Sequence, residues 1–167
     1  MAYLTLVNQH LSSARLLLGE LRAIEDSAVP LRGALEQSVL QLLNCAYICQ
    51  LRHIGDNYHC ADVAAVNDVP ALLKALGTIG KPAPEATELA VLLDEGWLGE
   101  LLRARRQLCL PASLQTSRRL TSRPSQSAIA LHDDSGQASL LNADTLQQWL
   151  LAIEELVQRH CAMMIEY

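Results

Sequence analysis

The stretch LTLVNQHLSSARLLLGEL, residues 4–21, decides the fold class of this chain. Its apolar residues recur at intervals of three and four, the spacing of an α-helix that packs one face against other helices. Polar side chains such as Asn8, Ser12 and Arg15 occupy the other faces. The apolar stripe consists of Leu4, Val7, Leu11, Ala14, Leu18 and Leu21.

Further stripes predict three more main helices. One begins near Leu31 and covers residues 31–53, and a break follows at Gly55, where glycine favours a helix end. Another begins at Pro84 and reaches residue 108 in two pieces that meet near residues 94–97. The last begins after Asn142 or Asp144, which suit the N-cap position. Short helices are expected over residues 58–66 and, capped by Asp68 and closed by Gly77, over residues 71–76. We therefore predict an all-α fold, an antiparallel bundle of four main helices with short helices between them.

Length and composition predict one domain that covers residues 1–167. Half of the residues are hydrophobic and only 4% are aromatic, with no Phe, which favours Leu- and Ala-rich helices over sheets. This hydrophobic content excludes a largely disordered chain. Five cysteines, no basic leader before an apolar run and no long uncharged stretch predict a soluble, cytoplasmic protein without a membrane span.

Residues 111–127, PASLQTSRRLTSRPSQS, show no helical period and are rich in Ser, Thr, Arg and Pro. They predict a long, flexible, basic loop. The surrounding segment, residues 101–132, contains six arginines and no Asp or Glu, so it carries +6. The rest of the chain carries −11, because the total is −5. The six residues are Arg103, Arg105, Arg106, Arg118, Arg119 and Arg123.

Two interpretations of this segment stay open. Arginine presents planar donors that match carboxylates and phosphates, so the six residues are candidates for binding an anionic partner. The candidate partners are an acidic protein surface, a second copy of the chain and nucleic acid. The net charge of −5 and the absence of aromatic residues for base stacking count against single-stranded nucleic acid without excluding it. The alternative is a cationic helix end followed by a solvated loop.

Cys45, Cys49 and His53 recur at intervals of four and therefore share one helix face. Thiolate and imidazole are the usual zinc ligands, which makes the three residues a weak alternative metal site. However, the cysteines lie on the apolar stripe of their helix, and free cysteine is commonly a small buried apolar residue. We expect no metal and no cofactor. A third, weaker possibility is a ligand pocket lined by Cys45, Cys49 and Trp97.

Several short patterns resemble a bacterial family of small helical proteins of unknown function. They are Ala14-Arg15, Leu43-Asn44-Cys45-Ala46-Tyr47, Trp97-Leu98, Leu101-Leu102 and the helix start between Leu141 and Trp149. The resemblance implies a compact helical bundle in the bacterial cytoplasm. It implies no activity and no catalytic residues.

The pair Arg52 and His59 has the Arg-x6-His spacing. This spacing resembles the motif of the HEPN ribonucleases, and the resemblance implies a metal-independent ribonuclease in which Arg52 positions a phosphate and His59 is catalytic. The expected break at Gly55 would separate the two residues, which favours a helix-end arginine and a loop histidine. The sequence therefore favours a non-catalytic interaction protein, with the ribonuclease as the alternative.

Overall fold

The computed structural model describes residues 2–25, 28–81, 83–110 and 141–165, and these residues form helices and no strand. The expectation of an all-α protein is confirmed for this part of the chain. The elements are α1 (Ala2–Ala23), α2 (Val29–Asn57), the 3₁₀ turn η1 (Val63–Ala65), α3 (Val69–Thr78), α4 (Pro84–Glu95), α5 (Trp97–Leu108) and α7 (Ala143–Ile165).

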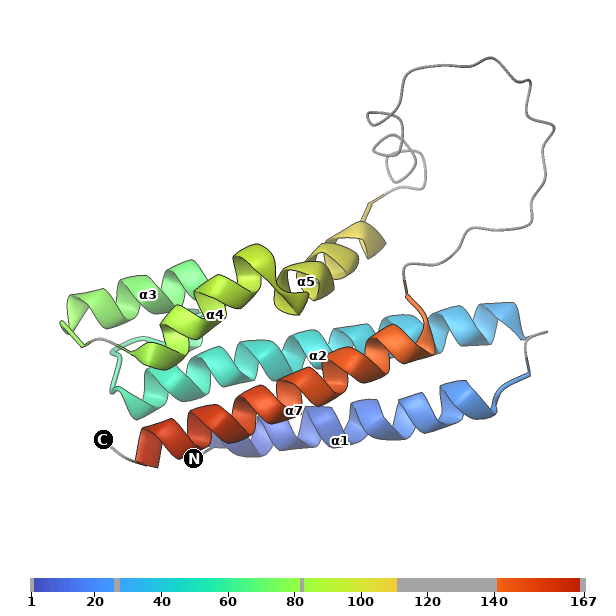
Figure 1. The fold of residues 1–167 in the computed structure, drawn as a ribbon, viewed down its shortest axis with the longest axis horizontal. Coiled ribbons are helices and arrows are strands. Elements are labelled where there is room, and N and C mark those ends of the chain that lie inside the picture. The colour runs from blue at the N-terminus through green and yellow to red at the C-terminus, as the bar shows by residue number, and fades with distance from the viewer. Residues whose placement is uncertain (1, 26–27, 82, 111–140, 166–167) are drawn as a thin grey trace, which may run out of the picture.

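Helices α1, α2 and α7 lie side by side, and α2 and α7 run in the direction opposite to α1 (Figure 1). Helices α4 and α5 follow one another along a second side of α2, with α3 beside α4 (Figure 1). Helix α2 packs against every other element, so it is the centre of the molecule. None of the helices in the described ranges is both long enough and apolar enough to cross a bilayer.

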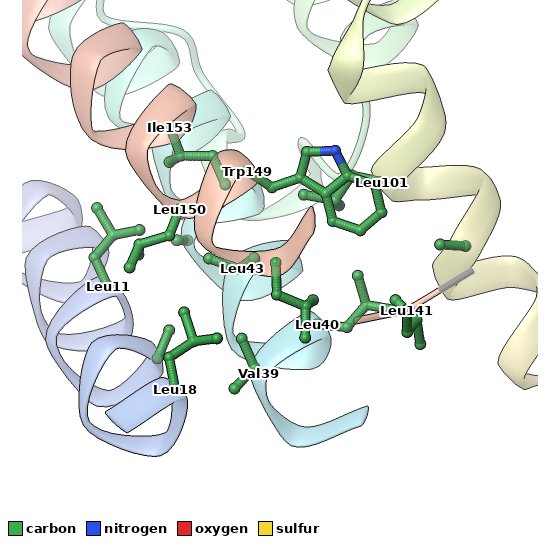
Figure 2. Packing of buried hydrophobic residues seen from close by; sticks show 14 of the residues in the cluster. Leu11, Leu18, Val39, Leu40, Leu43, Leu101, Leu141, Trp149, Leu150 and Ile153 are labelled. Atoms are coloured by element: carbon green, nitrogen blue, oxygen red, sulfur yellow. The ribbon is translucent and has the colours of Figure 1, made fainter. Parts of the chain in front are cut away.

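Two apolar clusters hold the helices together. The first joins α1, α5 and α7 to α2, and the second joins α3, α4 and the start of α5 to the C-terminal half of α2. Burying one leucine side chain in such a cluster contributes about 1.5–3 kcal/mol. Side chains labelled in the first cluster (Figure 2) include Leu11, Leu18, Val39, Leu40, Leu43, Leu101, Trp149, Leu150 and Ile153.

The apolar stripe of α1 is confirmed, because all its members except the partly buried Leu4 are buried. In α2 the stripe does not reach the first turn: Leu31 is 54% exposed. This turn lies next to the chain reversal that follows α1, and the buried face of α2 begins at Glu36.

The predicted break at Gly55 was wrong, because α2 continues to Asn57. Gly55 is buried close to the side chains of Val63 and Leu72, and it keeps a helical backbone there. The helix ends instead at Asn57, and His59, two residues further on, has a left-handed backbone with φ 60°. The N–H groups of His59 and Cys60 donate to the carbonyl oxygens of Asp56 and Gly55, at 3.1 and 2.9 Å. These two bonds form a Schellman motif with a histidine in the left-handed position.

Helix α3 ends in the same motif, with Gly80 at φ 64° in place of the predicted Gly77. Its start is as predicted, because the Asp68 carboxylate accepts from the Ala71 N–H at 2.8 Å. Asn142 caps α7 through the Thr145 N–H at 2.7 Å. The junction predicted near residues 94–97 is confirmed at Gly96.

Candidate functional site

The last turns of α5 carry Arg103, Arg105 and Arg106. Leu101 and Ala104 of the same helix are buried in the first cluster, which leaves Arg103 and Arg106 exposed and Arg105 half-exposed. Residues three apart on a helix lie on one side, so Arg103 and Arg106 project from the same side of α5. Cations at this position also stabilise the helix, because its C-terminal end carries partial negative charge.

The contacts of these arginines are neutral. The Nε of Arg105 donates to Oε1 of Gln41 at 3.4 Å, and the Nε of Arg106 donates to the carbonyl oxygen of Leu102 at 3.3 Å. No carboxylate in the described ranges forms an ion pair with any of the three. Their guanidinium groups therefore retain donors for an external carboxylate or phosphate.

The arginines of α1 and α7 differ in this respect. Arg15 pairs with Glu154 at 2.5 Å and Arg22 with Asp144 at 3.6 Å, in both cases across the interface of α1 and α7. Arg159 pairs with Glu88 at 2.6 Å. Three arginines thus connect helices through ion pairs, whereas the three at the end of α5 form no ion pair with a carboxylate in the described ranges.

The other basic candidates, Arg118, Arg119 and Arg123, lie with the predicted loop 111–127 outside the described residues. The described part of the basic segment is the end of α5.

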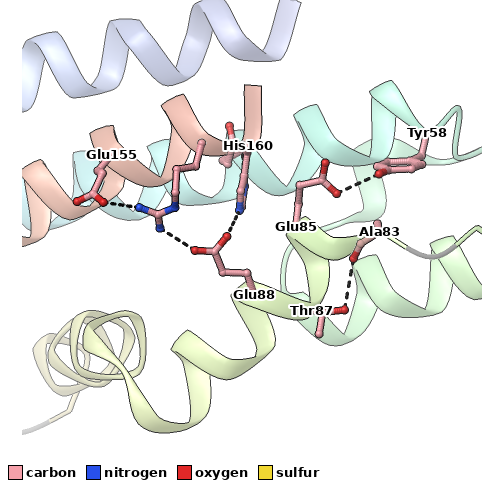
Figure 3. A network of polar contacts seen from close by, with 9 residues as sticks. Tyr58, Ala83, Glu85, Thr87, Glu88, Glu155 and His160 are labelled. Carbon is pink, nitrogen blue, oxygen red and sulfur yellow. Dashed lines mark hydrogen bonds and ion pairs between the residues drawn. The ribbon is translucent and has the colours of Figure 1, made fainter. Parts of the chain in front are cut away.

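A second polar cluster, buried at one end and exposed at the other, lies where α2, α4 and α7 meet (Figure 3). His160 of α7 is fully buried, and its Nδ1 lies 3.2 Å from Nε2 of the buried Gln50. Its Nε2 lies 3.2 Å from Oε2 of Glu88 on α4. The Glu88 carboxylate also accepts from Arg159, which pairs in turn with Glu155 at 2.5 Å.

Hydrogen-bond chemistry places the protons of His160. The Glu88 carboxylate only accepts, so Nε2 of His160 carries a hydrogen and donates it. Nδ1 then accepts from the Gln50 amide, which is the pattern of a neutral imidazole. Burial lowers the pKa of His160 and outweighs Glu88, which raises it. Both ring nitrogens are engaged in hydrogen bonds, so His160 links α7 to α2 and α4.

Next to this network, Tyr58 donates to Oε2 of the fully buried Glu85 at 3.0 Å (Figure 3). The other carboxylate oxygen of Glu85 has no hydrogen-bond partner in the described part of the chain. On α2, His53 is half-buried; burial lowers its pKa, and the nearby His160 lowers it further.

Arg52 and His59 are close in sequence at the end of α2 but have separate contacts. Arg52 donates to the carbonyl oxygen of Val66 at 3.1 Å and to Oδ1 of Asn67 at 2.7 Å. These bonds fasten the segment after η1 to α2. His59 is exposed and forms the end of α2 with its left-handed backbone. The structure therefore assigns each residue a local structural contact, and no hydrogen bond in the described chain joins the two.

The thiol candidates occupy different surroundings. Cys49 is buried in the first cluster, and burial raises the pKa of its thiol, which disfavours the thiolate that zinc requires. The half-buried Cys45 accepts from Nε2 of Gln41 at 3.7 Å. Within the described ranges, no group of three His, Cys, Asp or Glu side chains is placed to hold a metal ion. Cys45, Cys49 and His53 therefore do not converge into a zinc site.

Two surface cavities lie elsewhere. One, of about 280 Å³, lies between α1 and α7 beside Arg15 and Glu154. The other, of about 700 Å³, lies between α3 and the start of α4 beside Tyr58 and Lys81. Neither is lined by the cysteines or by Trp97, which packs against both apolar clusters. The structure thus gives no support to a ligand pocket at these three residues.

Sequence reasoning missed the network around His160. The available signal was a polar residue in an apolar register: Gln50 lies four residues before the buried Ile54, and His160 lies four after the buried Leu156. Similarly, Glu85 lies four residues before the buried Leu89. Buried polar groups require partners, so these positions predict a network but not which helices supply it.

The fold and the two sites define a small all-α protein with an outward-facing basic helix end and a buried polar network. The chain matches the "Family of unknown function (DUF6586)" over residues 1–161, and it belongs to that family. No curated protein and no solved structure matches it. The expected membership of a family of unknown function is thus confirmed.

Proposed function

We propose that this protein is a non-catalytic interaction protein of the bacterial cytoplasm, whose arginines at the end of α5 bind an acidic surface of a protein partner. One observation carries the proposal: Arg103, Arg105 and Arg106 have no carboxylate partner in the described ranges, whereas Arg15, Arg22 and Arg159 are paired.

The placement of the three arginines supports this function. They project from a helix whose other side is buried, so the backbone that presents them is already ordered and loses little conformational entropy on binding. Arg118, Arg119 and Arg123 follow in the same acid-free segment and would add charge to the surface. Complementary charge of this kind increases association rates and selects partners.

An acidic protein is favoured over nucleic acid as the partner. Residues 101–132 contain no aromatic side chain on which bases could stack, which disfavours single-stranded nucleic acid. A second copy of the chain also offers acidic surface, because the residues outside this segment carry −11. We infer that the scaffold is an antiparallel bundle of four helices, with α4 and α5 together in the fourth position.

The test is a triple variant, Arg103→Gln/Arg105→Gln/Arg106→Gln, titrated with fluorescent poly-L-glutamate and, separately, with an RNA oligonucleotide. We expect wild-type protein to bind poly-L-glutamate in a salt-dependent manner. The variant should bind on the order of tenfold more weakly, because exposed ion pairs contribute roughly 0.2–1 kcal/mol each.

A matched control, Arg15→Gln/Arg22→Gln/Lys74→Gln, removes the same charge from α1 and α3. It should bind poly-L-glutamate nearly as wild type does. Equal binding by wild type and the α5 variant would contradict the proposal. Preferential binding of RNA would assign the surface to nucleic acid instead.

A further inference from the structure

The Gln50 amide is the unusual member of the buried network. Its Nε2 donates to Nδ1 of His160 at 3.2 Å, while its Oε1 is buried and has no hydrogen-bond partner in the described chain. A buried amide oxygen without a partner costs about 1–3 kcal/mol. The Gln50 amide therefore has an unused acceptor, Oε1, and rotation of the amide would bring this atom to Nδ1 of His160.

Charged and titratable groups face His160 from all three helices. Glu88 and Glu85 on α4 favour the imidazolium, whereas Arg159 on α7 and His53 on α2 oppose it. Glu88 is the closest, and its side chain is 31% exposed, which gives this end of the network access to solvent. Burial of the ring is the largest influence and keeps it neutral near pH 7.

We propose that Gln50 and His160 form a proton-operated switch in which the Gln50 amide turns over when His160 takes up a proton. In the neutral state, Nε2–H of His160 donates to Glu88 and Nδ1 accepts from Nε2 of Gln50. In the acid state, one proton from solvent is added to Nδ1. The Gln50 side chain then rotates by half a turn about its last bond, so that Oε1 accepts the new N–H.

The half-turn is needed because protonated Nδ1 and the amide NH₂ are both donors and cannot bond to each other. Rotation exchanges the positions of the amide oxygen and nitrogen, which are nearly equal in size, and moves no backbone atom. It changes one hydrogen bond from N–H···N to N–H···O. The contact between His160 and Glu88 becomes an ion pair, so the interface of α4 and α7 changes charge while the fold is retained.

The decisive experiment is an NMR titration of the intact wild-type protein that follows the ring nitrogens of His160 and the side-chain NH₂ of Gln50. We expect the Nε2–H tautomer at pH 7. On acidification, the ring and the Gln50 NH₂ signals should shift with one common midpoint below 6.5. An Nδ1–H tautomer at pH 7, or Gln50 signals that stay constant while His160 titrates, would overturn the proposal.

Two variants test the direction of the coupling. Gln50→Glu places a carboxylate beside Nδ1 and should raise the midpoint of His160 by about one pH unit or more. Gln50→Met supplies no acceptor for the new N–H and should lower it. An unchanged midpoint in both variants would also overturn the proposal. His59→Asn, at the exposed end of α2, is the control and should leave the His160 titration unaltered.

Discussion

His160 and Glu88 connect the last helix to α4 by a contact of 3.2 Å between Nε2 and Oε2, although the histidine is fully buried and the carboxylate is partly exposed. The contact is a structural link, because the second ring nitrogen is occupied by Gln50. It fastens α4, and through it α3, to the central helices.

Glu88→Ala tests how much this link stabilises the fold. The substitution leaves the buried Nε2–H of His160 without an acceptor, which should lower the free energy of unfolding by about 1–3 kcal/mol. Urea denaturation followed by circular dichroism measures the change. Glu155→Ala, which removes only a surface pair of Arg159, should cost less than about 0.5 kcal/mol. Equal losses of unfolding free energy in the two variants would contradict this prediction, because the contact with His160 would then stabilise the fold no more than a surface ion pair does.

The buried histidines predict a loss of stability in acid. The pKa values of His160 and His53 are lowered by burial below 6.5, so the unfolded chain binds more protons than the folded protein below that pH. The contribution of the two histidines to the free energy of unfolding should therefore be fully present above about pH 6.5. It should be lost as the pH falls through the lowered pKa values, by at most about 1.4 kcal/mol per pH unit for each histidine.

Melting temperatures measured between pH 5 and 8 check this dependence. His160→Gln should flatten it, because one of the two titrating groups is removed. His59→Asn, at an exposed position, should leave the slope unchanged. A slope that survives in His160→Gln and disappears in His59→Asn would contradict the assignment.

Gly99 occupies a position where the chain comes close to itself. A Cβ there would lie 2.4 Å from the carbonyl oxygen of Leu93, so backbone would have to move. Gly99→Ala should therefore destabilise the protein by about 1–3 kcal/mol. A Cβ added at Gly19 in α1 would meet no atom of another element within 4 Å. Gly19→Ala should therefore stabilise the protein by about 0.5–1 kcal/mol. Thermal unfolding of both variants shows whether the signs are opposite.

His59 should be replaceable by glycine with a gain in stability. Its φ of 60° strains a residue with a Cβ, so His59→Gly should stabilise the fold by up to about 1 kcal/mol. The converse change at the end of α3, Gly80→Ala, should destabilise it by a similar amount. If His59 were catalytic, a purified wild-type protein would cleave RNA and the His59→Gly variant would not.

The helices were predictable from the sequence because their apolar periodicity is local. The stripe from Val7 to Leu21 can be recognised without knowing which helix packs against it. Asp68 can likewise be recognised as the N-cap of α3 from its place before the apolar run. The end of α2 was not predictable in this way. Gly55 is a good helix terminator locally, but its packing against Val63 and Leu72 is a tertiary contact that keeps the helix intact.

The two sites also differ in how far local sequence predicts them. The arginines of α5 were recognisable in the sequence as a run of positive charge. That they have no carboxylate partner among the described residues is a property of the fold. The network of Gln50, His160 and Glu88 joins residues separated by 110 and 72 positions. A polar residue in an apolar stripe signals that a partner exists, but only the packing of α4 and α7 against α2 identifies it.

The most direct test of the proposed function is an NMR titration with poly-L-glutamate that observes the Nε–Hε signals of the arginines. We expect the signals of Arg103, Arg105 and Arg106 to shift, while those of Arg15 and Arg159, held in ion pairs, stay in place. Saturable shifts confined to the end of α5 would support an anion-binding surface there. Unshifted α5 signals, or larger shifts at Arg15 and Arg159, would contradict it.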